Sequence, residues 1–392
     1  LCGQFHEKTL HDLKNFKKMS QKTQVRSEYL DCAEVSWFAP ICDGADRYLG
    51  ELNMKYTSNW ENTSNILLNA DKLGYRNILC PSSYQVGQDT IPFVSAVSPM
   101  TKNINILAAI RCGEVYPPML ARTLTTIDHI LEGRLTINII SSNLPGENLP
   151  SEDRYNRSRE VIEILKQAWT KEEINFTGNF YNLKLPTNPV KPYQIGGPLL
   201  YFGGYSPPAL ELCAEHCDVY LMWPETEDNL RGLMENMSEK AAKFNRSVDF
   251  GLRVHVVVRE TEEEANKYAE SIISKLDLEM GRELRDRSLD AKSYGVSRQE
   301  KMRDKSSPDG YIETNLWTGI GKARSGCGAA LVGNPDQIIE KLNRYMEMGI
   351  RSFILSGYPH IDECNSFAEL VLPRLKNCSM HHEQGRIIQH VS

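Results

Sequence analysis

Short apolar runs alternate with stretches of helical period along most of this chain, and this alternation limits its fold more than any other feature. Eight runs rich in apolar and β-branched residues are expected to form strands, at 35–39, 77–80, 104–110, 135–140, 199–202, 219–222, 251–258 and 352–355. Continuous apolar runs are typical of strands that are covered on both faces. Strands that alternate with helices predict a parallel sheet.

Segments with helical spacing lie between these runs and after the last of them. We expect helices at 62–73, 90–98, 118–131, 154–169, 208–215, 227–244, 262–275, 335–348 and 361–375. A doubly wound open sheet would show the same alternation, but eight strands favour an α/β fold of the (β/α)₈ TIM-barrel class. The chain has 392 residues. Such barrels exceed about 250 residues as one domain when they carry insertions.

Two segments interrupt the alternation. Residues 172–197 predict a small hairpin followed by a connection that contains several prolines. Residues 280–333 are charged at first and then rich in glycine, so we expect an insertion that acts as a lid, with a solvated surface excursion as the alternative. The expected division is a poorly ordered extension at 1–32, a barrel domain at 33–378 and a C-terminal tail at 379–392.

Charge and composition exclude several classes of protein. The formal net charge is −6, whereas nucleic-acid-binding proteins normally carry an excess of basic residues. No apolar run reaches the ~18 residues that span a membrane, and the lysine-rich start lacks the apolar segment of a secretory signal. The ten cysteines form no C-x-x-C pair, which fits a reducing compartment, so we expect a cytoplasmic protein.

Polar and aromatic residues follow several predicted strands, where the active site of a barrel of this class lies. They include Arg111, Ser142, Gly203, Gly204, Trp223 and Tyr358. The run that contains Gly203, Gly204 and Ser206 predicts a phosphate site, because glycines let the backbone approach a ligand and Ser206 can cap the helix that follows. A plain strand-to-helix turn with a good cap is the alternative.

The run 251–259 carries charge inside an apolar strand. Alternation of side chains places Arg253 and His255 on one face of this strand. A buried guanidinium is costly unless an anion pairs with it, and an anionic ligand at the barrel mouth would supply that partner. Imidazole can move a proton near neutral pH. The alternative is a structural arginine–carboxylate pair beside a satisfied core histidine.

Taken together, the motifs resemble those of the two-component, FMN-dependent alkanesulfonate monooxygenases of the bacterial luciferase-like superfamily. The resemblance runs from about residue 35 to about residue 375. Its motifs are WFAPICDGADRYLG at 37–50, TTIDHILEGRLTINII at 125–140, DRYNRS at 153–158, PLLYFGGYS at 198–206, DVYLMW at 218–223, GLRVHVVVRETEEEA at 251–265, NLWTGIGKARSGCGAALVG at 315–333 and SFILSGYPH at 352–360.

This resemblance implies a cofactor, partners and a set of site residues. It implies reduced FMN (FMNH2) supplied by a separate NAD(P)H-dependent FMN reductase, O2 and a small organosulfur substrate, a homodimer or homotetramer, and no metal. The residues that match the family's catalytic positions are Arg253, His255, Arg324, Tyr358 and His360. Those that match positions near the flavin are Asn138, Tyr155 and Ser206, and we add Gly203, Gly204 and Trp223 as expected cofactor contacts.

Three positions depart from the family pattern. Cys42 stands where the family has a histidine, Val86 or Gly87 stands where it has a cysteine, and Glu114 adds an acid beside Arg111. These changes concern the substrate side more than the flavin side. The expected reaction is the desulfonation of an alkanesulfonate to an aldehyde and sulfite. The alternatives are a sulfone, thioether or aldehyde substrate, with or without light emission, a deazaflavin-dependent reductase and a flavin-binding homologue without catalysis.

Overall fold

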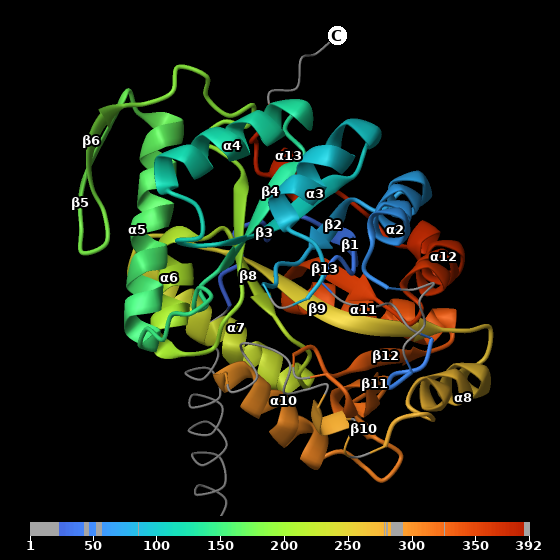
Figure 1. Cartoon of the computed structure of the whole chain (residues 1–392). Coiled ribbons are helices and arrows are strands. Elements are labelled where there is room, and N and C mark those ends of the chain that lie inside the picture. The colour runs from blue at the N-terminus through green and yellow to red at the C-terminus, as the bar shows by residue number, and fades with distance from the viewer. Residues whose placement is uncertain are drawn as a thin grey trace, which may run out of the picture.

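A closed ring of eight parallel strands forms the centre of the molecule (Figure 1). The computed structural model describes residues 23–42, 47–51, 57–84, 86–277, 279, 281–283, 293–324 and 326–387. In order around the ring, the strands are β1 (Glu34–Phe38), β2 (Asn77–Cys80), β3 (Asn105–Arg111), β4 (Leu135–Ile140), β7 (Leu199–Phe202), β8 (Val219–Met222), β9 (Asp249–Val258) and β13 (Ile350–Ser356). Pairing of β8 with β9 closes the ring, so the predicted barrel is confirmed.

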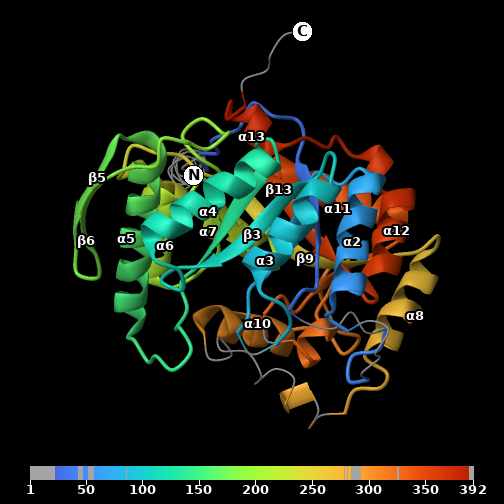
Figure 2. The same cartoon turned by 45° about the horizontal axis from the view of Figure 1, so that its top comes forward.

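Helices surround this barrel on its outer side (Figures 1 and 2). They are α2 (Trp60–Leu73), α3 (Thr90–Val97), α4 (Pro117–Ile130), α5 (Ser151–Thr170), α6 (Pro207–His216), α7 (Glu227–Ala242), α8 (Glu262–Ile272), α11 (Pro335–Met348) and α12 (His360–Leu370). Each corresponds to a predicted helix. The last prediction ran on to residue 375, but α12 ends at Leu370 and a separate 3₁₀ turn contains Pro373, which cannot donate a helical hydrogen bond.

Alternation along the strands sorts the barrel interior into layers. At the floor, the Glu34 carboxylate accepts hydrogen bonds from the Tyr201 hydroxyl (2.6 Å) and the Asn77 amide (3.1 Å). Phe38, four residues further along β1, lies at the other end, where the Arg253 guanidinium is 4.5 Å from its ring centre. Between them is an apolar layer of Leu79, Leu107, Leu199, Tyr201, Val219, Leu221 and Ile354. The barrel is therefore filled below and polar at its C-terminal mouth.

The opposite faces of the strands pack outward against the helices. Leu252, Val254 and Val256 of β9 are fully buried in the outer core, together with residues of the surrounding helices. Arg253 and His255 therefore point to the other side, as the alternation predicted.

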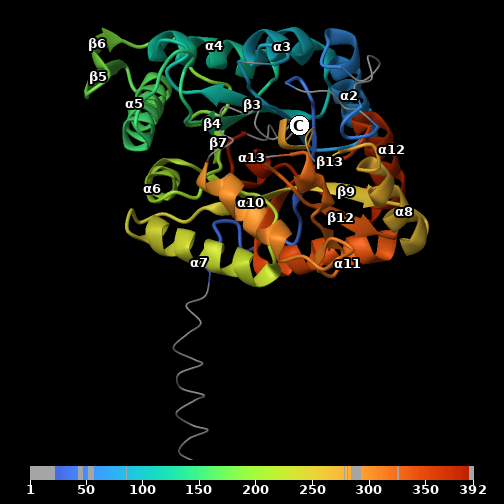
Figure 3. The same cartoon turned by 60° about the horizontal axis from the view of Figure 1, so that its bottom comes forward.

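Two additions decorate the barrel. The predicted hairpin is present as β5 (Glu173–Thr177) and β6 (Asn182–Pro186). The described part of the 280–333 insertion contains α10 (Tyr294–Asp304), β10 (Tyr311–Glu313), β11 (Leu316–Trp317), a 3₁₀ turn (Gly319–Lys322) and β12 (Ala330–Gly333). Strand β12 lies beside β9 (Figure 3) and pairs with its second half, beyond the residues that pair with β8. The insertion thus has secondary structure of its own and is fixed to the barrel.

Segments from both ends of the described chain close the barrel floor. The backbone N–H of Ser27 donates to the Asp249 carboxylate (2.8 Å), and Ser27 is buried. Asp218 forms ion pairs with Arg26 (2.8 Å) and Arg386 (3.0 Å). The expected extension and tail lie partly outside the described residues, at 1–22 and 388–392. Among the described helices, none has both the length and the apolar composition that a membrane crossing needs.

Candidate active site at the barrel mouth

Arg253 is a buried cation without a carboxylate partner in the described part of the chain. Its side chain is directed toward the mouth and lies over the Phe38 ring. Its Nη1 donates only to the backbone oxygens of Val254 (3.2 Å) and Ile354 (3.4 Å). Burial lowers the pKa of the Arg253 guanidinium from its ordinary value, although arginine stays charged at neutral pH. A buried guanidinium in this state is ready to pair with an anion.

The structural arginine–carboxylate pair, which was the alternative for this strand, is formed instead by Arg259. Its guanidinium makes a bidentate pair with Glu363, at 2.6 and 3.0 Å, and lies 3.5 Å from the Tyr268 ring centre. Arg259 is thus satisfied within the protein, whereas Arg253 is not.

His255 is held on both ring nitrogens. Its Nε2 lies 3.2 Å from the Cys327 carbonyl oxygen, which can only accept, so this nitrogen carries the hydrogen. Its Nδ1 then accepts from the Ser356 hydroxyl at 2.6 Å. Burial, Arg253 and His360 lower the pKa of His255 well below its ordinary value of 6.5. The neutral imidazole is therefore favoured at neutral pH. That His255 moves a proton there stays a prediction.

Tyr358, Arg324 and His360 gather beside His255. The Arg324 Nε donates to the Tyr358 hydroxyl at 2.8 Å, and the rings of Tyr358 and His255 have centres 5.3 Å apart. His360 is buried, with its ring centre 5.3 Å from that of Tyr358, and its Nδ1 has no partner among the described residues. Burial, Arg253 and Arg324 lower the pKa of His360 well below 6.5. The structure thus brings together all five expected catalytic residues.

The insertion contacts this cluster from above. Besides its carbonyl contact with His255, Cys327 donates from Sγ to the Arg253 carbonyl oxygen (3.4 Å). A Cβ added to Gly326 would lie 3.2 Å from the Trp223 ring, and one added to Gly295 would lie 2.9 Å from it. Gly295 and Gly326 both belong to the insertion, so Trp223 packs against two separate segments of it. Sequence reasoning missed Phe38 and Cys327 as neighbours of Arg253; only the alternation of β1 signalled Phe38, and nothing local signalled Cys327.

The expected phosphate side lies at the end of β7. Gly204 is required by close packing, because a Cβ there would lie 2.8 Å from the Ala209 Cβ of α6, whereas Gly203 is exposed. Ser206 occupies the cap position of α6, but its side chain makes no cap bond. Pro208 removes one of the two N–H groups from which a cap side chain accepts, and the other, that of Ala209, does not donate to Ser206. The Ser206 Oγ is buried without a partner in the described structure.

Two further expected flavin contacts lie on neighbouring elements. Tyr155 of α5 is half-buried, and its ring centre is 6.3 Å from that of Phe202 on β7. Asn138 of β4 is 9% exposed, and its Oδ1 is another buried atom for which the described residues supply no partner. Hydrogen-bonding atoms without partners thus lie along β4 and β7, which are neighbours in the barrel.

Cys42 and Gly87, two of the positions that depart from the family pattern, are each fitted to their surroundings. Gly87 has φ 80°, and a Cβ there would lie 2.1 Å from the Ile41 carbonyl oxygen, so no cysteine fits on this backbone. Cys42 is buried and donates from Sγ to the Pro81 carbonyl oxygen (3.3 Å). Burial raises the pKa of the Cys42 thiol to about 12, so it is neutral.

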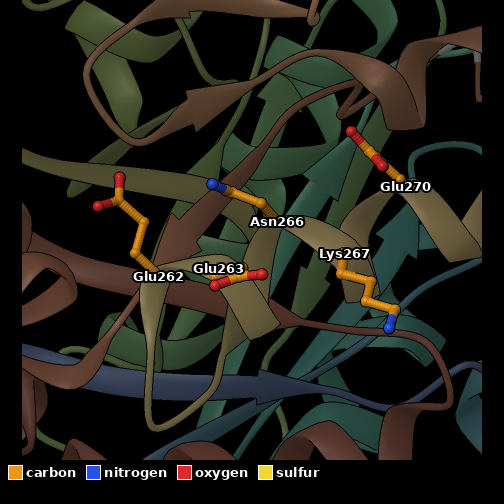
Figure 4. A pocket seen from close by; sticks show the side chains of 5 residues that line it. All are labelled: Glu262, Glu263, Asn266, Lys267 and Glu270. Atoms are coloured by element: carbon orange, nitrogen blue, oxygen red, sulfur yellow. The ribbon is translucent and has the colours of Figure 1, made fainter.

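Two other polar clusters lie away from the mouth. A shallow surface depression is lined by residues of α8 alone, with no buried polar group directed into it (Figure 4): Glu262, Glu263, Asn266, Lys267 and Glu270. The other cluster is Glu163, Glu215 and His216 on α5 and α6, whose ligand-type atoms lie within 4.8 Å of one another. Glu215 already pairs with Arg159 at 2.9 Å, and Lys166 and Arg246 also act on His216, which opposes cation binding. We assign neither cluster a ligand.

A family model and the two curated relatives described below are all named as monooxygenases. The family model described as luciferase-like monooxygenase matches residues 33–352. A protein of Agrobacterium fabrum named sulfoquinovose monooxygenase is 56% identical over 365 residues, which are 93% of this chain and 95% of the relative. A protein of the same name from Novosphingobium aromaticivorans is 48% identical over 353 residues, 88% and 97% of the two chains. A riboflavin lyase solved with modified FMN and riboflavin shares the fold, with a TM-score of 0.72, 13% identity and coverage of 92% and 94%.

The family match spans the barrel and its insertion, and the two relatives cover nearly the whole chain at high identity. Both relatives are named monooxygenases, and the barrel mouth carries the residues that the sequence motifs predicted. The chain therefore belongs to the luciferase-like monooxygenase family and is an oxidoreductase of the monooxygenase class.

Proposed function

We propose that this enzyme uses reduced FMN and O2 to oxygenate the carbon that bears a sulfonate group in a sugar of the sulfoquinovose type. In balanced form, R–CH2–SO3⁻ + O2 + FMNH2 gives R–CHO + HSO3⁻ + H2O + FMN. The C–S bond breaks, one oxygen atom enters the aldehyde, and the other leaves as water. An alkanesulfonate would follow the same equation, but the names of the two relatives favour the sulfonated sugar.

The single observation that carries this proposal is Arg253. It is a charged side chain, 7% exposed, at the mouth of the barrel, and no carboxylate of the described residues pairs with it. A sulfonate offers three acceptor oxygens and a negative charge, which suit a guanidinium. A neutral substrate such as an alkane or aldehyde would leave this buried charge without compensation.

Residues at the mouth fit reduced FMN. The buried Ser206 Oγ and Asn138 Oδ1 have no partners among the described residues, and a ligand phosphate or ring would supply them. Tyr155 and Trp223 would add aromatic contacts, and Gly203 and Gly204 would allow close backbone approach. When bound, reduced FMN supplies the two electrons that oxygenation of the substrate by O2 requires.

The chain's own residues position charge and exclude water. Arg253 would bind the sulfonate, and Arg324, held on the Tyr358 hydroxyl, would add a second positive charge from the insertion. The insertion covers His255 and Trp223, so the described contacts favour its predicted role as a lid. His255 is neutral, and its fixed orientation makes it a hydrogen-bond donor from Nε2 once the Cys327 carbonyl moves away.

This proposal includes partners. Reduced FMN would come from an NAD(P)H-dependent FMN reductase, and the chain would act as a homodimer or homotetramer. A sulfone, thioether or aldehyde substrate is the second candidate on the same scaffold. The unpaired Arg253 favours a sulfonate over these neutral compounds.

The test is aerobic turnover with a generic FMN reductase and NADH. Sulfite release and H2O2 release would be measured with sulfoquinovose, with hexane-1-sulfonate and with dimethyl sulfone. We expect sulfite from the sulfonates and none from the sulfone. The Arg253→Ala variant should release H2O2 at the wild-type rate and no sulfite. Sulfite release by this variant at the wild-type rate would defeat the assignment.

A further inference from the structure

A second buried arginine lies at the barrel mouth. Arg111 is the last residue of β3 and is 5% exposed. Its Nη2 donates to the Ser82 carbonyl oxygen at 3.4 Å, while its Nη1 is buried and finds no acceptor in the described structure. No carboxylate of the described residues forms an ion pair with it. Neither the fold nor the proposed sulfonate contact accounts for this donor.

A second unused polar group lies on the next strand. Ser142 follows β4, is 3% exposed, and its Oγ has no partner among the residues that the structure describes. In the sheet register, Arg111 is paired with Ile140, two residues before Ser142. Arg111 belongs to the inward-facing set of β3, together with Leu107, because alternate residues of a strand face the same side. Ser142 lies two residues beyond the end of β4, and the alternation of β4 continued from Ile140 would direct its buried side chain to the same inner side. Arg111 and Ser142 thus lie at the ends of two neighbouring strands, on one wall of the mouth.

This wall stands opposite Arg253. In the order of the ring, β3 is four strands away from β9 in either direction, through β2, β1 and β13 or through β4, β7 and β8. A ligand bound at Arg253 that extends across the mouth would therefore meet Arg111 and Ser142 with its far end.

The surroundings of Arg111 favour a neutral polar group over a second anion. Glu114 lies close enough that Arg111 lowers its pKa, although burial has the larger, opposite effect. Its carboxylate would repel a sulfonate or phosphate at Arg111. A hydroxyl group suits all three residues, because it can accept from the guanidinium and donate to a carboxylate or to Ser142.

We propose that Arg111 and Ser142 form a hydroxyl-binding subsite that holds the sugar part of the substrate while Arg253 holds its sulfonate. This inference rests on the proposed function and names two residues that would determine its substrate specificity. A buried donor left without an acceptor is costly, so a site built around such groups discriminates strongly against an analogue that lacks the hydroxyls. An alkanesulfonate would leave both groups unpaired.

The experiment compares two substrates in two variants. Arg111→Met keeps the bulk of the side chain and removes its donors, and Ser142→Ala removes the hydroxyl. With sulfoquinovose, kcat/KM should fall about 10- to 100-fold in Arg111→Met and about 3- to 10-fold in Ser142→Ala. With hexane-1-sulfonate, it should change by less than about threefold in both, because an alkyl chain makes no hydrogen bonds with either group.

Arg134→Met is the matched control, because Arg134 is a half-buried arginine at the floor, where it donates to the Ile104 carbonyl oxygen at 2.6 Å. It should leave the ratio of the two kcat/KM values unchanged. Thermal unfolding checks that each variant is folded. If Arg111→Met does not fold, the result with Ser142→Ala alone decides whether the subsite exists. Anaerobic titration with reduced FMN should give the wild-type Kd in both variants.

Each contrary result has its own meaning. Equal losses with both sulfonates would place the sulfonate at Arg111, and a weakened Kd for reduced FMN would place the flavin there; either result overturns the subsite while leaving the proposed function intact. Wild-type enzyme that releases no sulfite from either sulfonate would overturn the proposed function, and the subsite with it.

Discussion

The Ser356 hydroxyl lies 2.6 Å from Nδ1 of His255 and holds that ring in place. The two residues are directly paired in the register of β13 and β9, so their distance is set by the barrel wall itself. The Cys327 carbonyl oxygen can only accept, so Nε2 carries the hydrogen and Nδ1 accepts from Ser356. The two contacts together fix the orientation of the ring.

Replacing Ser356 with alanine should lower kcat without affecting substrate binding. Loss of one hydrogen bond to the ring costs about 1 kcal/mol, which corresponds to a decrease in kcat of about fivefold. Ser356→Thr keeps the hydroxyl and should restore most of the rate. Steady-state kinetics of sulfite release separate kcat from KM. A raised KM at unchanged kcat would contradict a positioning role.

Stability should fall as the pH drops below about 6.5, the ordinary pKa of histidine. Burial and nearby arginines lower the pKa values of His255 and His360 in the folded state, so the unfolded chain binds more protons between the lowered and the ordinary values. Each such residue then contributes a loss of up to about 1.4 kcal/mol per pH unit in that window. Thermal unfolding from pH 7.5 to 5.5 measures the slope.

Two histidine substitutions, one at a buried and one at an exposed position, test the origin of this pH effect. His360→Asn should flatten the dependence of the melting temperature on pH, whereas replacement of the exposed His129 of α4 should not. Identical slopes for wild type and His360→Asn would show that His360 does not titrate on unfolding.

Asp218→Asn should destabilise the barrel floor. Burial raises the pKa of Asp218, but Arg386, the Leu200 N–H and Arg26 outweigh it, and the net pKa is lowered from 3.8. The carboxylate thus stabilises the fold above about pH 4, and this contribution is lost as the pH falls through the lowered pKa. Removing one charge from a buried cluster costs about 3 kcal/mol.

Urea unfolding at pH 7 and pH 3 measures the difference in the free energy of unfolding between wild type and Asp218→Asn. This difference should be large at pH 7 and smaller at pH 3. The exposed ion pair of Asp336 with Arg374 supplies the control, and Asp336→Asn should change the free energy of unfolding by less than about 0.5 kcal/mol. If Asp218→Asn were as stable as wild type at pH 7, the ion pairs of Asp218 with Arg26 and Arg386 would not stabilise the fold.

Gly204→Ala should destabilise the junction of β7 and α6. The added methyl would lie 2.8 Å from the Ala209 Cβ, so the helix or the strand end must move, at a cost of about 1–3 kcal/mol. Gly232→Ala in α7 meets nothing within 4 Å and should stabilise the protein by up to about 1 kcal/mol. Differential scanning calorimetry compares the melting temperatures of Gly204→Ala and Gly232→Ala. Equal melting temperatures would show that β7 and α6 move apart without a loss of stability.

The barrel was predictable because its strands are continuous apolar runs with two buried faces. The predicted strand at 135–140 and the observed β4 agree residue by residue, since Leu135–Ile140 lies between a glycine-containing turn and a polar loop. The facing of Arg253 and His255 followed from the alternation of side chains alone. The end of α12 was missed because the helical pattern continues through Pro373, which interrupts the hydrogen bonds.

The site was only partly predictable, because its contacts join segments that are distant in the sequence. The neutral state of His255 depends on burial and on Arg253 and His360, which no local pattern reveals. The packing of Trp223 against Gly295 and Gly326 arises from the folded insertion. The family motifs located Arg324 and Tyr358, but their hydrogen bond joins residues on different elements and appears only in three dimensions.

Strand β9 changes its neighbour partway along its length. From Asp249 to Leu252 it is bound to β8, and from His255 onward it is bound to β12 of the insertion. One edge of β9 therefore has two partners in succession, β8 of the barrel and then β12 of the insertion, while its other edge pairs with β13 from Phe250 to His255. Mutations in β12 can change the surroundings of His255 through this shared edge, while the eight barrel strands keep their pairing. Substrate selectivity can therefore change in evolution without a change in the stability of the barrel.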